Sequence, residues 1–137
     1  MKITLPGSIR SKKNSKQPLA IPAPGKSTLF KQYKNAGLKP VRIIMVPSTA
    51  YKNWDKEARH AARQQYRGDP VNRPVHVVAK VYYKGQQPDL SGCLESVGDA
   101  MEGVLWANDK LIMSWDGSRL EKDNANPRTE IEVRAHE

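Results

Sequence analysis

The sequence predicts a mixed α+β fold, with a small sheet of four or five strands and two main helices. Three observations lead to this prediction. Short runs rich in Val, Ile and Tyr stand between Gly- and Pro-containing turns. Two longer segments repeat apolar residues every three to four positions. The chain has 137 residues, 38% of them hydrophobic, which suits one domain spanning residues 1–137 with a modest core.

The strands are expected where β-branched and aromatic residues gather. The strongest pattern is VHVVAKVYY at 75–83, and the apolar run VRIIMV at 41–46 indicates a buried strand. The segment between the last two strands is polar and contains Pro127, so we expect a loop there. The expected strands are residues 2–5, 41–46, 75–83, 110–115 and 129–134.

The first helix should begin after Pro47, with Ser48 or Thr49 as N-cap, and should end near residue 66. Its other face carries basic side chains that face either DNA or water. The apolar stripe of this helix is Tyr51, Trp54, Ala58, Ala61 or Ala62, and Tyr66, and the basic residues are Lys52, Lys56, Arg59 and Arg63.

The second helix should begin with Asp89 as N-cap and end at Gly103. One side is apolar, and Cys93 beside it is expected to be a small buried hydrophobe and not a nucleophile. The apolar side comprises Leu90, Leu94, Val97, Met101 and Val104, with Cys93 and Ala100 adjacent. The other face carries Glu95, Asp99 and Glu102.

Basic residues dominate the N-terminal part of the chain. No acidic residue precedes Asp55, whereas eleven basic ones do, and the whole chain has a formal charge of +9. We interpret residues 8–40 mainly as a long basic loop, which is either solvated or an arm that contacts phosphates. The segment PAPGKST at 22–28 lacks the first glycine of a phosphate-binding loop.

Several classes of function are disfavoured by composition. One cysteine permits no internal disulfide, and three scattered histidines argue against zinc. No apolar run has the length of a signal peptide or a membrane span, so we expect a cytoplasmic protein.

Residues 85–109 contain five carboxylates and no Lys or Arg. These acids are either a solvated helix face or a site for a hard divalent cation such as Mg²⁺, which two or three carboxylates can hold. Asp89 and Asp109 stand on separate elements, so they can converge from two sides. Carboxylates within a basic chain suggest a metal-dependent enzyme acting on nucleic acid.

Five segments recur in a known order and spacing: ITLPG and SKKNSK near the N-terminus, PSTAYKNW at 47–54, PDL at 88–90 and DAMEGVLWANDKLI at 99–112. In these segments the sequence resembles the RusA family of Holliday-junction resolvases, over nearly its whole length. The resemblance implies a RusA-like fold and a homodimer that binds four-way DNA junctions and cuts them with Mg²⁺ or Mn²⁺. Asp89 matches the family's first metal-binding Asp, Asp109 the second member of its acidic pair, and Asp99 the Asp of its Asp-Ala-Leu segment.

The sequence departs from the family pattern at four positions. Ser91 stands in place of the second catalytic Asp, Gly92 in place of an Asn, Glu95 in place of the supporting Lys, and Asn108 in place of the first acid of the pair. Positions 91 and 95 are one helical turn apart, and side chains lean toward the helix N-terminus, so Glu95 can restore the lost carboxylate.

We therefore expect Asp89, Glu95 and Asp109 to be catalytic metal ligands, with Asp99 as an additional ligand. Two alternatives remain open: a non-catalytic junction- or DNA-binding relative, and an RNA- or single-strand-binding module, which the 7% aromatic content disfavours. The residues expected to contact DNA are Lys12, Lys13, Lys16, Lys84 and Lys110, and Lys84, Lys110 or a loop lysine would replace the family Lys.

Overall fold

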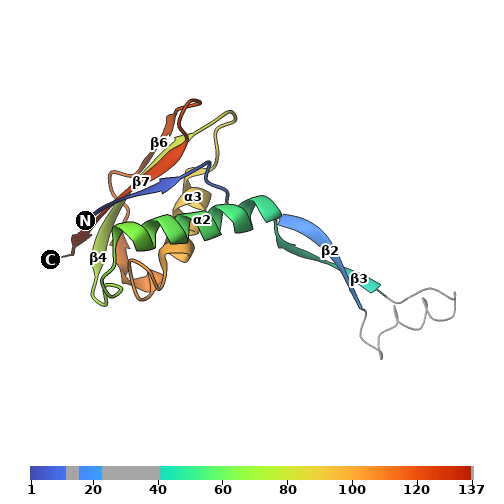
Figure 1. The fold of residues 1–137 in the computed structure, drawn as a ribbon, viewed down its shortest axis with the longest axis horizontal. Coiled ribbons are helices and arrows are strands. Elements are labelled where there is room, and N and C mark those ends of the chain that lie inside the picture. The colour runs from blue at the N-terminus through green and yellow to red at the C-terminus, as the bar shows by residue number, and fades with distance from the viewer. Residues whose placement is uncertain (12–15, 23–40, 137) are drawn as a thin grey trace, which may run out of the picture.

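The computed structural model describes residues 1–11, 16–22 and 41–136, and it confirms the α+β class. The helices are α2 (Thr49–Gln65), α3 (Leu90–Met101) and the 3₁₀ helix η1 (Asp109–Leu111). The strands are β1 (Lys2–Pro6), β2 (Lys16–Pro22), β3 (Val41–Pro47), β4 (Val75–Tyr83), β5 (Ile112–Ser114), β6 (Arg119–Lys122) and β7 (Arg128–Ala135). Figure 1 shows a sheet-and-helix body from which β2 and β3 project.

The main sheet has five strands in the order β1-β7-β4-β5, and β6 also pairs with β4. Strand β7 lies antiparallel between β1 and β4, whereas β5 and β6 run parallel to opposite ends of β4. Alternate residues of β4 and β7 are buried, as expected for a sheet with one covered face. The other face is charged, with Lys80 of β4 opposite Glu130 of β7.

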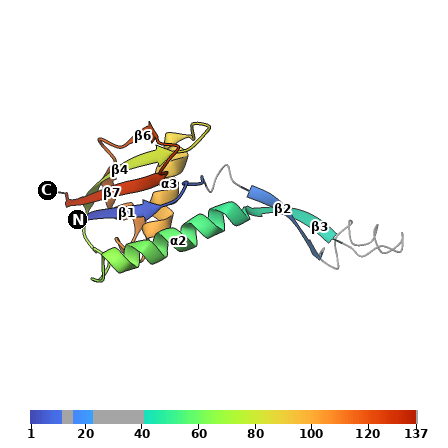
Figure 2. The ribbon, with the colours of Figure 1, turned by 45° about the horizontal axis from the view of Figure 1, so that its top comes forward.

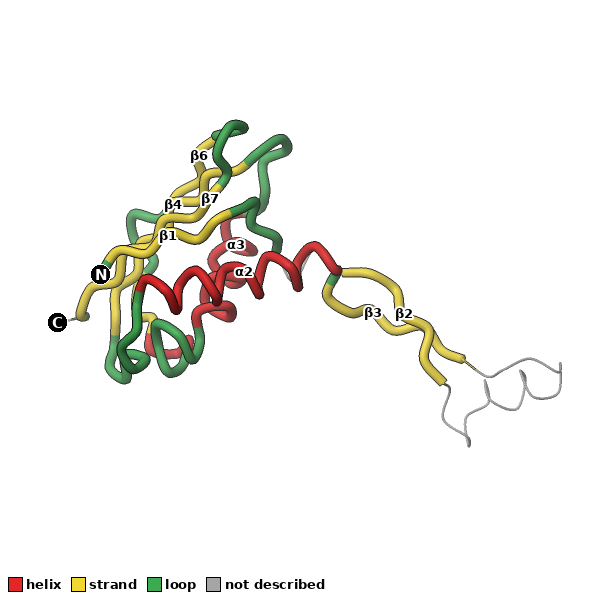
Figure 3. The backbone as a smooth tube through the Cα atoms, viewed as in Figure 1, coloured by secondary structure: helices red, strands yellow, loops and turns green. Residues whose placement is uncertain are grey.

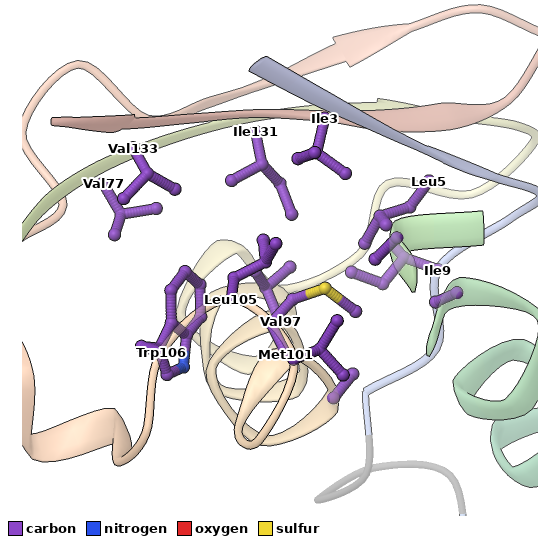
Figure 4. Close-up of a cluster of buried hydrophobic side chains, with 14 of the residues drawn as sticks. Ile3, Leu5, Ile9, Val77, Val97, Met101, Leu105, Trp106, Ile131 and Val133 are labelled. Carbon is purple, nitrogen blue, oxygen red and sulfur yellow. The ribbon is translucent and has the colours of Figure 1, made fainter. Parts of the chain in front are cut away.

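The core lies between this sheet and the two helices. Figure 4 shows Ile131 and Val77 from the sheet above Val97 and Met101 of α3. Trp106, which is fully buried, closes the same cluster and donates its indole N–H to the carbonyl oxygen of Gly98 at 3.1 Å. The segment after α3 is therefore held against the helix, which places the residues that follow beside it.

Helix α2 crosses the body beside α3 (Figure 2). Ser48 is confirmed as its N-cap, because the Ser48 hydroxyl accepts a hydrogen bond from the backbone N–H of Tyr51 at 3.1 Å. The expected apolar stripe is buried from Tyr51 to Ala62, with Ala62 and not Ala61 as its member, and Tyr66 at the C-cap is partly buried. Arg59 differs from the expectation of a free basic face, because it is half-buried and its guanidinium donates to the carbonyl oxygen of Ala100 in α3 at 2.9 Å.

The prediction that residues 8–40 are mainly a loop is wrong for residues 16–22. These residues form β2, which pairs antiparallel with β3 in a separate two-stranded sheet. The strand expected at 41–46 exists, but it is not buried: Ile43 is 63% exposed and Met45 60% exposed. Its continuous apolar character suggested a core strand, whereas it belongs to a ribbon that projects beyond α2 (Figure 3).

The C-terminal part contains two smaller corrections. The strand expected at 110–115 is shorter, because η1 occupies Asp109–Leu111 and β5 begins only at Ile112. The segment expected to be a loop before residue 129 contains β6, four residues paired with the end of β4. Within the described residues, no helix is long and apolar enough to cross a membrane.

Candidate functional site

Helix α3 leaves one narrow face uncovered. With about 100° of rotation per residue, Ser91, Glu95 and Glu102 project within a sector of roughly 40°. Ser91 and Glu95 are exposed and Glu102 is half-buried. The buried residues on the other sides are Gly92, Cys93, Ser96, Val97, Ala100 and Met101, and Gly98 is buried at the edge of this face. The acids of α3 are thus confined to one face by the burial of the rest of the helix.

Asp109 reaches this same face from η1. A methyl group in place of a Gly98 hydrogen would lie 3.9 Å from the Asp109 Cβ, so Asp109 stands close to the Gly98 backbone. The backbone N–H of Asp109 donates to the Glu102 Oε1 at 3.1 Å. Asn108 caps η1, because its Oδ1 accepts a hydrogen bond from the backbone N–H of Lys110 at 2.9 Å. We call Glu95, Glu102 and Asp109 the acidic face.

Asp89 occupies the N-cap position of α3, as expected, but its side chain makes no capping hydrogen bond. Its Oδ2 instead accepts a hydrogen bond from the Ser91 hydroxyl at 3.0 Å. The separation of six positions from Asp89 to Glu95 corresponds to about 9 Å along the helix axis. Asp89 therefore lies at the N-terminal end of the helix, beyond the acidic face.

Gly92 allows the chain after β1 to approach this end of α3. A Cβ at position 92 would stand 2.6 Å from the Oγ of Ser11 and 3.4 Å from the Oδ2 of Asp89. One turn further along, the buried Ser96 hydroxyl donates to the carbonyl oxygen of Arg10 at 2.8 Å. A glycine at position 92 thus has a physical reason, which is the close approach of Ser11.

Asp99 lies on the side of α3 that faces α2. The pKa of the Tyr51 phenol in α2 is raised to about 12, first by burial, then by the charges of Asp55 and Asp99. Asp99 is half-buried there, about 40° around the helix from Glu95 and about 60° from Glu102. Its expected role as an additional ligand stays a prediction.

A divalent cation would have to be held here by few protein ligands. Among the described residues, no group of three or more His, Cys, Asp or Glu side chains is close enough to hold a metal ion. Mg²⁺ often takes one or two carboxylates and completes its shell with water and substrate phosphate oxygens. Glu95 and Asp109 are both exposed, and that mode requires no third carboxylate beside them.

An open pocket of about 450 Å³ lies beside Asp89. Its walls come from the segment after β1, including Arg10, and from the segment after β4, including Lys84. Both cationic residues are exposed. The pocket therefore combines positive charge with the carboxylate at the start of α3, an arrangement that suits a phosphate group.

The other lysines expected to contact DNA lie in different places. Lys110 is exposed next to Asp109, and Lys16 is exposed at the start of the projecting ribbon. Lys12 and Lys13 lie outside the described residues. Of the three that the structure describes, Lys84 and Lys110 flank the carboxylates of the site.

Sequence reasoning gave two residues no role. Glu102 was placed on the acidic helix face, but its hydrogen bond to Asp109 depends on a turn that periodicity does not describe. Arg10 was one of many basic residues, and its position in the pocket follows from the Ser96 hydrogen bond. Neither contact leaves a trace in residue spacing.

An acidic face flanked by cations in a chain of charge +9 is typical of enzymes that act on nucleic acids. A family model described as "Endodeoxyribonuclease RusA" matches residues 24–134. Because this match covers most of the chain, the protein belongs to the RusA family of Holliday-junction-resolving endonucleases, whose substrates are branched DNA. A search of curated proteins found no match.

Proposed function

We propose that this chain is a divalent-metal-dependent endonuclease that resolves four-way DNA junctions in the cytoplasm as a homodimer. The observation that carries the proposal is the placement of Asp109 against Gly98, beside the Glu102 side chain and on the face that presents Glu95. Two elements separated in sequence thereby bring carboxylates to one exposed surface. Two equivalent cuts in a two-fold symmetric junction are most simply made by a two-fold symmetric protein.

Asp109 and Glu95 would hold Mg²⁺, or Mn²⁺ in its place, together with a phosphate of the DNA. When bound, the cation would neutralise the phosphate, lower the pKa of an attacking water and stabilise the leaving oxygen. Arg10 and Lys84 would hold a phosphate in the pocket beside Asp89. Lys84 is our choice for the role of the family lysine, because it lines that pocket and Lys110 does not.

Glu95 is proposed to carry the charge missing at Ser91. Both side chains are exposed and stand one turn apart on the same face. A glutamate leans toward the helix N-terminus, and its extra methylene extends its reach to the space over Ser91. The Asp89 carboxylate accepts a hydrogen bond from the Ser91 hydroxyl. Asp89 and Glu95 would then lie on either side of Ser91.

Cleavage of a synthetic four-way junction tests the proposal. Asp89→Asn, Glu95→Gln and Asp109→Asn should each abolish cutting while junction binding stays equal or becomes tighter, because negative charge beside the phosphate is removed. Glu57→Gln, at an exposed carboxylate on α2, serves as the control and should cut normally. The double variant Ser91→Asp with Glu95→Lys recreates the family pattern and should retain activity. Normal cutting by Glu95→Gln would refute the compensation at position 95.

One observation favours a second candidate, a non-catalytic junction-binding protein. The described carboxylates form no three-ligand cluster, and the Ser91 hydroxyl occupies an oxygen of Asp89. Such a protein would bind four-way junctions with the affinity of a nuclease but cut none in Mg²⁺ or Mn²⁺. If the unaltered protein binds junctions but cuts none in either metal, the proposed endonuclease is refuted and the non-catalytic junction-binding protein takes its place.

A further inference from the structure

The projecting sheet of β2 and β3, called the ribbon below, is apolar along the middle of both of its faces, and its two cations, Lys16 and Arg42, stand near its two ends. Cross-strand partners in an antiparallel pair share a face. One face presents Met45 opposite Pro18 and Ile43 opposite Ala20, and the other presents Ile44 opposite Leu19. No charged residue occurs at 17–21 or 43–46. Of the large hydrophobic side chains exposed in the described chain, the ribbon holds three: Leu19, Ile43 and Met45.

The ribbon has little support from its own subunit. Within the described residues, β2 and β3 pack on each other and make only marginal contact with other helices and strands. One of those contacts is at the base, where the Thr49 N–H donates to the Gln17 Oε1 at 3.3 Å. An isolated two-stranded sheet is marginally stable in water, and an apolar projecting surface indicates a missing partner.

We propose that the ribbon is a clasp that binds a second copy of this chain. The proposal rests on the homodimer of the proposed function and assigns its contact surface. DNA is a poor occupant of the middle of the ribbon, because phosphate contacts require cations and hydrogen-bond donors, and the side chains at 18–21 and 43–46 offer neither. A second copy also carries +9, so the copies repel each other wherever basic surfaces meet. An uncharged, self-complementary patch is where such chains can approach about a two-fold axis.

The dimensions of the ribbon agree with a clasp that uses both faces. Strands of seven residues span about 24 Å, and two strands are about 10 Å wide, so each face covers roughly 240 Å². Single-face contact would fall well short of the roughly 800 Å² per partner of a stable interface. If each ribbon is covered on both faces, the two ribbons and the surfaces that they cover bury roughly 1,900 Å² in total, within the usual range.

Sedimentation of the full chain at micromolar concentration tests the clasp. The double variant Ile43→Lys with Met45→Lys places charge on one ribbon face, and in a two-fold dimer each substitution is present in both copies. We expect its dimer dissociation constant to rise by at least about 100-fold. Met113→Lys is the matched control, because Met113 is 57% exposed on β5, outside the ribbon, and it should remain dimeric. Thermal unfolding of each variant shows that the sheet-and-helix body is intact.

A second measurement does not depend on a destabilising substitution. A benzoylphenylalanine photo-crosslinker at position 43 should yield an adduct of two chains, and the same group at position 113 should not. A lysine double variant that stays dimeric, absence of the adduct, or a wild-type protein that is monomeric at micromolar concentration would each overturn the clasp. Loss of DNA binding without loss of dimerisation would overturn it in favour of a DNA contact. A clasped dimer that cuts no junction leaves this inference standing and refutes only the proposed function.

Discussion

The hydrogen bond from Asp109 to Glu102 makes a specific prediction about the role of Glu102. The Asp109 N–H donates to the Glu102 Oε1 at 3.1 Å, and the Glu102 side chain is half-buried. A hydrogen bond to a charged group contributes about 1.5–3 kcal/mol when buried, so a partly solvated one contributes about 1–2 kcal/mol. If that free energy serves to hold Asp109 in place, Glu102→Ala should lower kcat/KM by roughly 5- to 30-fold, at about 1.4 kcal/mol per factor of ten.

A junction-cleavage assay over a series of Mg²⁺ concentrations separates positioning from metal ligation. Glu102→Gln keeps an oxygen acceptor for the Asp109 N–H but removes the charge, so a positioning role predicts a loss of less than about 3-fold. A ligand role predicts that Gln is as damaging as Ala and that both variants require more Mg²⁺. Glu57→Ala is the control on the exposed face of α2. If Glu102→Ala cuts at the wild-type rate with unchanged Mg²⁺ dependence, the positioning argument fails.

Three further predictions concern the surroundings of the site. Gly92→Ala should destabilise the protein by about 1–3 kcal/mol in chemical denaturation, because its Cβ would stand 2.6 Å from the Ser11 Oγ. Adding Ser11→Gly should restore most of this loss, and stability changes of the two substitutions that simply add would refute the contact. Burial, followed by the charge of Asp89, raises the pKa of the Cys93 thiol from 9.0 to about 11. As the pH rises, the thiol of the unfolded chain therefore ionises before that of the folded chain, so the free energy of unfolding should fall above pH 9. Cys93→Val should make this fall smaller. Lys84→Glu should lower the log-log salt slope of junction binding by about 0.9, and an unchanged slope would mean that Lys84 contacts no phosphate.

Most helices and strands of the sheet-and-helix body could be predicted, because the apolar residues of each one repeat with a single period. The alternation in 75–83 and the three-to-four spacing of Tyr51, Trp54 and Ala58 give the elements and their buried faces. The ribbon could not be predicted in this way. A strand apolar on both faces has the same pattern as a strand in the middle of a core, so the run at 41–46 suggested burial. Residues 16–22 contain two prolines, Pro18 and Pro22, which argue against a central strand but are tolerated in an exposed ribbon.

In the candidate site, too, some features follow from neighbouring residues in the sequence and others depend on long-range contacts. Helical rotation alone places Glu95 and Glu102 on one face, which is local information. The contact of Asp109 with Gly98 depends on Trp106, whose indole N–H is bonded to the Gly98 carbonyl and fixes the return of the chain. Sequence separation gives no access to such a contact. For the same reason the spacing of the acids could not show that Asp99 faces α2.

Helix α2 connects the ribbon to the acidic face, and this connection gives the clasp a functional consequence. Strand β3 ends at Pro47, and the next residue, Ser48, caps α2 with its own side chain. Arg59 then bonds the Ala100 carbonyl, so α2 is fixed on the helix that carries Glu95. The joint between β3 and α2 is therefore short and capped, and α2 beyond it is packed on α3. A two-fold contact through the ribbon would therefore set the distance between the two acidic faces of a dimer, and cutting two strands at matched positions across a junction requires a fixed distance of this kind.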